Sequence, residues 1–142
     1  MSWPEGLPVL RIRVARPTDR LDEVVEFYRD GLGLVELGRF EAHDGYDGVM
    51  LGLPGSDVHL EFTSHEDGSA CPAPSVDNLL VLYVDSEVAA SLVAARLADM
   101  GYSDVESDNP YWDGRSITIP DPDGWRLVLD WGLAEGDRKS VV

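Results

Sequence analysis

The first regular pattern in the chain is a strict alternation of apolar and polar side chains. Over residues 9–15 the apolar positions 10, 12 and 14 fall on one side, and the other side carries Arg11, Arg13 and Ala15. This period of two predicts a half-buried β-strand. Thr18 or Asp19 then caps a predicted helix with apolar residues spaced three and four apart, and the helix ends at Gly33.

The same order of elements returns in the second half of the chain. Residues 79–84 form an apolar strand, Ser86 caps an alanine-rich helix, and Gly101 ends it. Thr18 to Ser86 and Gly33 to Gly101 are both separations of 68 residues. Two independent landmarks with one offset indicate an internal duplication.

Three strand-like runs follow each predicted helix. They cover residues 34–40, 47–53 and 58–63 in the first half and 102–106, 115–119 and 125–131 in the second. The turn at 121–124 has the sequence Asp-Pro-Asp-Gly. The prediction is an α+β fold of two tandem βαβββ modules, residues 9–65 and 78–131, with a linker at 66–77 and a tail at 132–142.

Two segments carry a family resemblance. Residues 27–34, FYRDGLGL, resemble the FYRDxLGL signature of the glyoxalase, bleomycin-resistance and extradiol-dioxygenase superfamily, also called the vicinal oxygen chelate (VOC) proteins. Residues 117–124, ITIPDPDG, are similar to the DPDGNxL element that precedes the last strand of these proteins. The resemblance covers about residues 9–131. It implies one VOC domain over residues 1–142, with curved mixed sheets around a small-molecule cavity.

The resemblance also implies where a divalent metal would bind. Enzymes of the superfamily generally take one ligand from the first and one from the last strand of each module, and these positions fall at Arg13, Glu61, Leu79 and Val128. Arginine stays protonated, and leucine and valine have no donor atom, so only Glu61 is a competent ligand. We therefore expect no cofactor.

Other assignments are open at this site. In another register, the implied ligand position on the first strand falls at Arg11. The position on the fifth strand falls at Asn78 if the register moves by one residue. An altered metal site is also conceivable. Its ligands would be three residues at inward-facing positions of their strands, namely His59, Glu61 and Asp130.

The residues expected to bind a ligand are those that line the implied cavity: Arg13, His59, Glu61, Tyr83, Trp112 and Arg115. A guanidinium there favours a carboxylate, phosphate or enolate. Trp112 is expected either to stack on the ligand or to cap the core. We predict that the protein binds or sequesters a partly aromatic, anionic small molecule, as resistance proteins of the superfamily do, rather than acting as an enzyme. The alternative is a metal-dependent lyase, isomerase or dioxygenase with an altered ligand set around Glu61.

Composition narrows the list of partners. There are 27 acidic against 11 basic residues, a formal net charge of -16, which disfavours nucleic acid and anionic membrane surfaces. No apolar stretch is long enough to span a membrane or to resemble a secretion signal. Cys71 is the single cysteine, so we expect no internal disulfide and a reducing cytoplasmic location. Exposed sheet edges make a homodimer an open alternative to a monomer.

Overall fold

The structure, a computed structural model, describes residues 2–135. It divides into two compact units, Met1–Cys71 and Pro72–Val142, and the division falls inside the segment predicted as a linker. The first unit contains β1 (Ile12–Pro17), α1 (Leu21–Val25), the π-helix η1 (Glu26–Gly31), β2 (Val35–His43), β3 (Tyr46–Gly52) and β4 (Val58–His65). The second contains β5 (Leu79–Tyr83), α2 (Glu87–Asp99), the 3-10 helix η2 (Pro110–Trp112), β6 (Ser116–Pro120) and β7 (Arg126–Asp130).

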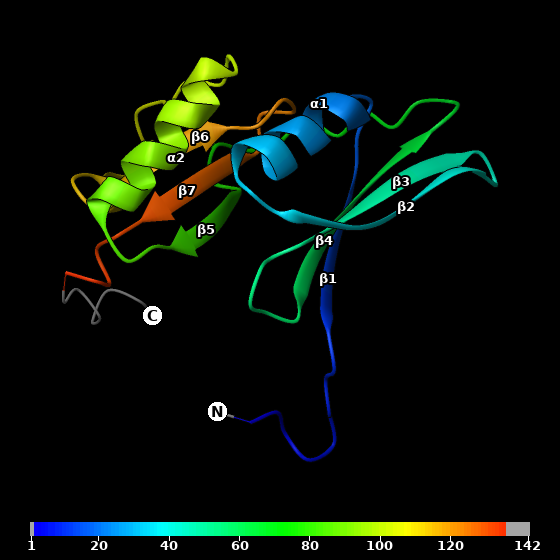
Figure 1. Cartoon of the computed structure of the whole chain (residues 1–142), viewed down its shortest axis with the longest axis horizontal. Helices are drawn as coiled ribbons and strands as arrows, with labels where there is room; N and C mark the ends of the chain where they lie inside the picture. The colour runs from blue at the N-terminus through cyan, green and yellow to red at the C-terminus, as the bar shows by residue number, and fades with distance from the viewer. Residues whose placement is uncertain (1, 136–142) are drawn as a thin grey trace. The chain divides into compact units, whose positions relative to one another are not determined.

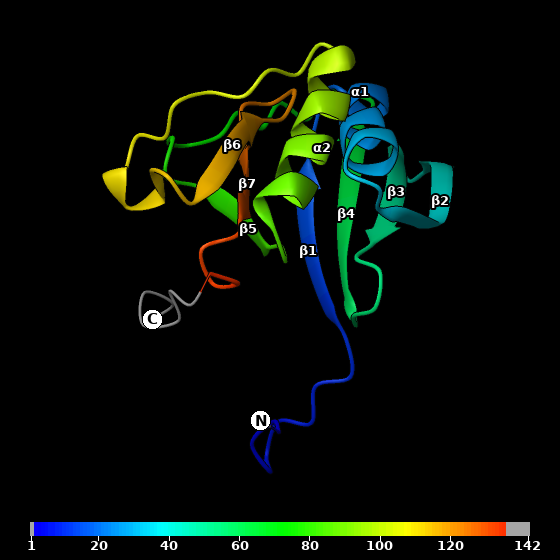
Figure 2. The ribbon, with the colours of Figure 1, turned by 60° about the vertical axis from the view of Figure 1, so that its left-hand side comes forward.

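The first unit is a four-stranded sheet with a helix on one face. Its strand order is β1-β4-β3-β2, and β1 runs parallel to β4 (Figures 1 and 2). Alternation along β3 and β4 directs Val49, Leu51, Leu60 and Phe62 to the helical side, where they are buried. The helices supply the other half of this core with Val24, Val25, Phe27 and Tyr28. The opposite face of the sheet is thereby left for other side chains.

The start of the first unit differs from the prediction. The strand begins at Ile12 rather than at residue 9, because pairing with β4 starts at Ile12, opposite Val58. The Ile12 N–H donates to the carbonyl of Asp57, the residue before β4, at 2.9 Å. β1 is an edge strand and α1 packs over β4, so Val14 stays 56% exposed instead of buried. The predicted cap is also displaced. Thr18 Oγ1 accepts a hydrogen bond from the Arg20 N–H, and Arg20 takes the capping position.

The second unit repeats the plan with one strand fewer. Its sheet has the order β5-β7-β6, with β5 parallel to β7 and α2 packed over β6 and β7 (Figure 2). Ser86 caps α2 as predicted, since its Oγ accepts from the Ala89 N–H at 3.1 Å. Gly33 and Gly101, the two predicted helix stops, both have φ +99. The α+β fold of two tandem modules is confirmed.

The predicted strand at residues 102–106 is wrong. This segment makes a single bridge, from Val105 to Thr118, and no ladder. Val105 is the only strongly apolar residue between Ser103 and Ser107, so the segment has no apolar side to bury. The predicted turn at 121–124 is correct: Asp121 Oδ1 accepts from the N–H groups of Asp123 and Trp125.

None of the helices in residues 2–135 is long and apolar enough to cross a membrane. Residues 132–135 of the predicted tail are described, and residues 136–142 lie outside the described part of the chain.

Candidate functional site

Three of the predicted site residues share one face of the first unit. In the parallel pairing of β1 with β4, Arg13 lies opposite His59, and Ala15 lies opposite Glu61. Paired residues point to the same side of a sheet, and Leu60, between the two β4 residues, points to the buried helical side. The structure therefore brings Arg13, His59 and Glu61 together on the open face.

Arg13 bridges the other two side chains. Its Nε donates to His59 Nε2 at 2.9 Å, and its Nη1 lies 3.4 Å from Glu61 Oε2. His59 is buried at 5% exposure, whereas half of the Arg13 side chain is exposed. The group thus combines a buried imidazole with one accessible cation. We call Arg13, His59 and Glu61 the polar triad.

The open face continues across the neighbouring strands. In β3, Met50 pairs with Glu61 and Gly52 pairs with His59. The side chain of Leu37 from β2 lies over Gly52, where a Cβ would come within 3.0 Å of it. A depression of about 410 Å³ lies here, beside His59 and the β3–β4 turn. Its apolar lining comes from Val35, Leu37, Leu53, Pro54 and Val58.

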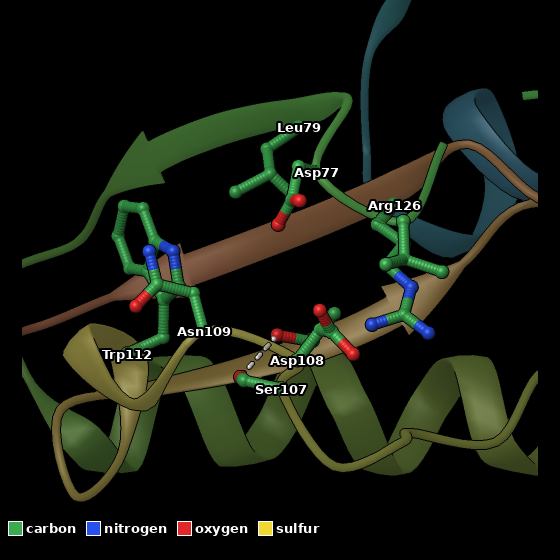
Figure 3. Close-up of a pocket in the computed structure, with 9 residues that line it drawn as sticks. Asp77, Leu79, Ser107, Asp108, Asn109, Trp112 and Arg126 are labelled. Carbon is green, nitrogen blue, oxygen red and sulfur yellow. Dashed lines mark hydrogen bonds between the residues drawn. The ribbon is translucent and has the colours of Figure 1, made fainter. Parts of the chain in front are cut away.

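The second unit contains two further predicted site residues, Tyr83 and Trp112. Tyr83 ends β5, pairs with Asp130 and is 46% exposed. Trp112, in η2, lines a hollow of about 10 Å³, enough for one water molecule (Figure 3). In Figure 3, charged side chains point into this hollow together with Trp112, namely Asp77, Asp108 and Arg126.

Arg115 lies in a buried ion pair. Its Nε donates to Asp130 Oδ2 at 2.9 Å, and the two residues are 7% and 0% exposed. Asp130 Oδ1 also accepts from the Gly132 N–H at 2.7 Å, and the guanidinium stacks 4.7 Å from the Tyr111 ring centre. A Cβ at position 132 would fall 2.6 Å from the guanidinium, so glycine is needed there. The charge of Arg115 is already matched inside its own unit.

The residues at the family's metal positions do not fit a divalent cation. At the positions that the resemblance implies, the two modules pair in the same way, Arg13 with His59 and Leu79 with Arg126. The Arg13 guanidinium occupies the space beside Glu61 and would repel a metal. Val128 is fully buried and has no donor. Within residues 2–135, no three His, Cys, Asp or Glu side chains are grouped to hold a metal ion.

The alternative ligand set of His59, Glu61 and Asp130 has donor atoms that already take part in hydrogen bonds. His59 Nε2 is engaged by Arg13, and both oxygens of Asp130 accept hydrogen bonds inside the second unit. Roles for the six predicted ligand-binding residues stay predictions.

A strongly perturbed carboxylate lies elsewhere on the first unit. Glu36 in β2 accepts hydrogen bonds from Arg39 and Arg29, which lower the pKa of Glu36 to about 2. The same contacts raise the pKa of Arg29 and of Arg39. This network ties η1 to β2 and contains no member of the polar triad, so its role is structural.

Two features of the open face go beyond the sequence prediction. One is the place of the depression beside the β3–β4 turn, and the other is that Arg11, considered from the sequence only as an alternative metal position, lines it. Gly52 was the available signal, because a glycine inside a strand often marks the close approach of another group.

Comparison with known proteins identifies the family. Residues 12–63 match the family model of the YycE-like N-terminal domain, and residues 77–130 match that of the YycE-like C-terminal domain. The uncharacterized YycE protein of Bacillus subtilis strain 168 is 54% identical over 119 residues, which cover 84% of this chain and 86% of that protein.

Solved structures agree with this match. The crystal structure of a Bacillus subtilis YycE protein of unknown function, described as a candidate glyoxalase or fosfomycin-resistance protein, has a TM-score of 0.85 at 49% identity, covering 92% of this chain and 94% of that one. Leishmania major glyoxalase I has a TM-score of 0.69 at 21% identity, covering 92% and 96%. TnmS3, an antibiotic-binding protein from Streptomyces sp. CB03234, has a TM-score of 0.62 at 22% identity, covering 88% and 98%. The last two show the fold alone.

Proposed function

The chain belongs to the YycE-like family of the glyoxalase, bleomycin-resistance and dioxygenase superfamily, and on this basis we propose that it binds a small, partly aromatic, anionic molecule without the family's metal ion. The observation that carries the proposal is the polar triad. A guanidinium is held against an imidazole and a carboxylate on an open sheet face, at the position that the resemblance implies for the first metal ligand.

The position of Arg13 supports binding of an anion. Burying a charged group is more costly than burying an apolar one of the same volume, so the mostly buried Glu61 beside a half-exposed Arg13 is better explained by recognition than by stability. The exposed half of the Arg13 side chain has N–H groups suited to two-point contact with a carboxylate or phosphate. The apolar depression next to His59 supplies a surface for the remainder of such a ligand.

The comparisons support a small molecule as the partner. An antibiotic-binding protein and a glyoxalase share the fold, and a relative at 49% identity is described as a candidate glyoxalase or fosfomycin-resistance protein. A binding or sequestering role needs no reacting group on this face, and one fold can serve both binding proteins and enzymes.

Metal analysis tests the absence of a family metal. We expect protein purified without chelator to contain far less than one equivalent of any divalent metal, and its melting temperature to stay unchanged when divalent ions are added. Aromatic acids are expected to raise it, since a ligand at 100 times its dissociation constant adds about 2.7 kcal/mol. Glu61→Ala is compared with Glu41→Ala, which removes an exposed carboxylate from β2.

One result would overturn the proposal. Stoichiometric metal that is lost in Glu61→Ala and kept in Glu41→Ala would establish the alternative, a metal-dependent lyase, isomerase or dioxygenase. The observation in its favour is that His59 and Glu61 lie on one face of β4, two residues apart. Such an enzyme would have to displace Arg13 from both side chains.

A cytoplasmic location and a homodimer stay part of the proposal. Light scattering on the purified full-length chain at several concentrations measures the oligomeric state directly.

A further inference from the structure

We propose that Arg11 anchors the anionic group of the ligand and that the depression beside it takes the ligand's apolar body. This inference rests on the proposed function and narrows it to amphipathic anions with a single charged end. Arg11 is not part of the polar triad. It is also not one of the four metal positions that the family resemblance implies first, where Arg13 stands instead.

Arg11 differs from the other basic residues in its surroundings. In residues 2–135 its side chain forms neither an ion pair nor a hydrogen bond, a property it shares with Arg126 alone among the arginines described. Arg13 can still reach an anion through the exposed half of its side chain, but Glu61 offsets part of its charge. A cation without a partner in a chain of net charge -16 is therefore the stronger attractant for an anion on this face.

The backbone places Arg11 at the edge of the depression. Ile12 is held to Asp57 by a backbone hydrogen bond of 2.9 Å, which fixes the chain next to the β3–β4 turn. Arg11 and Arg13 are two residues apart on an extended chain, so they share the side of His59. His59 is the connection between the two features, because it accepts from Arg13 and also lines the depression.

The lining of the depression specifies the rest of the ligand. A volume of about 410 Å³ lies within the range of small-molecule sites, roughly 300–1,000 Å³. Apolar side chains of β2 and the β3–β4 turn make up most of the wall, and Arg11 is its cation. Asp57 also lines it but is not paired with Arg11, and it disfavours a second negative charge on the ligand. One anionic group on an apolar body fits this arrangement.

A pair of fluorescent probes tests the assignment on the full chain. 8-Anilinonaphthalene-1-sulfonate is an aromatic anion, and N-phenyl-1-naphthylamine has the same ring skeleton without the sulfonate. We expect Arg11→Gln to weaken binding of the sulfonate about three- to fivefold, as for a solvent-exposed charge contact. Binding of the neutral probe should be unchanged. Arg11→Lys keeps the charge and should retain most of the affinity, and Arg20→Gln makes the same charge change at the start of α1 as a control.

Location is tested by filling the depression. Val35 is 51% exposed on β2, so Val35→Trp adds volume at the wall without disturbing the core. This variant should weaken both probes together. Melting temperatures of all variants, measured without probe, verify that each one is folded.

The outcomes separate this inference from the function on which it rests. Sulfonate binding that is equally tight in Arg11→Gln and wild type would overturn the role of Arg11 and leave the binding function standing. An equal loss for both probes in Arg11→Gln would overturn it as well, because a charge contact must discriminate between them. Wild-type protein that binds neither probe would refute both proposals.

Discussion

The buried ion pair of the second unit allows a quantitative prediction. Asp130→Asn removes the negative charge but keeps a carbonyl oxygen for the Gly132 N–H, so the main change is the loss of the counter-charge of Arg115. Asp130 is fully buried and Arg115 is 7% exposed, so solvent provides little compensation. Leaving a buried charge unpaired costs about 3–5 kcal/mol. In a protein of this size that lowers the melting temperature by roughly 6–20 °C.

Urea unfolding at pH 7 measures this cost. Three of the four tryptophans, at positions 112, 125 and 131, belong to the second unit, so their fluorescence reports on it. The double variant Arg115→Met/Asp130→Asn removes both charges and should recover more than half of the lost stability. A cost below about 1 kcal/mol for Asp130→Asn, or a double variant no more stable than the single one, would refute the reasoning.

Three further predictions concern single side chains. Arg39, with a second arginine, lowers the pKa of Glu36 to about 2 from an ordinary value near 4.5. The stabilisation is therefore complete above pH 4.5 and lost as the pH falls toward 2, and Glu36→Gln should flatten the acid dependence of unfolding. Gly48→Ala should cost about 1–3 kcal/mol in urea unfolding, because its Cβ would lie 2.3 Å from the Phe40 ring. Ser86→Ala should cost about 1 kcal/mol through the loss of the α2 cap.

Each of these has a matched control. Glu41→Gln alters an exposed carboxylate on the same strand as Glu36 and should leave the acid profile unchanged. Gly6→Ala places its Cβ in open space and at an ordinary φ, so equal costs at positions 6 and 48 would contradict the packing argument. Ser91→Ala, on the exposed surface of α2, should be neutral, unlike Ser86→Ala.

Most of the fold could be predicted because local patterns determine it. The alternation of β4, the helix stops at Gly33 and Gly101 and the turn at Asp121 all depend on residues close to one another in the chain. The start of β1 could not be predicted in this way. It depends on where β4 begins, more than forty residues away, through the bond from Ile12 to Asp57.

The parts of the candidate site that depend on local spacing could also be predicted, and those that depend on distant residues could not. The face shared by His59 and Glu61 follows from a spacing of two along one strand. The partner of Arg115 is fifteen residues away on another strand, and its burial depends on Gly132 leaving room. No local pattern distinguishes a ligand-binding arginine from one neutralised by its own fold. Arg11 entered only as an alternative metal position, because the residues that line the depression with it come from the distant β3–β4 turn.

The Arg115–Asp130 and Arg13–Glu61 pairs also differ in what mutation can do to them during evolution. Arg115 and Asp130 are so enclosed that a change in one is tolerated only with a compensating change in the other, and the pair should persist or disappear as a unit among descendants. Arg13 is half exposed on an edge strand, and its substitution leaves the core intact. One half of the duplicated fold therefore carries a charged pair that constrains substitution, and the other carries an arginine that a single substitution can replace.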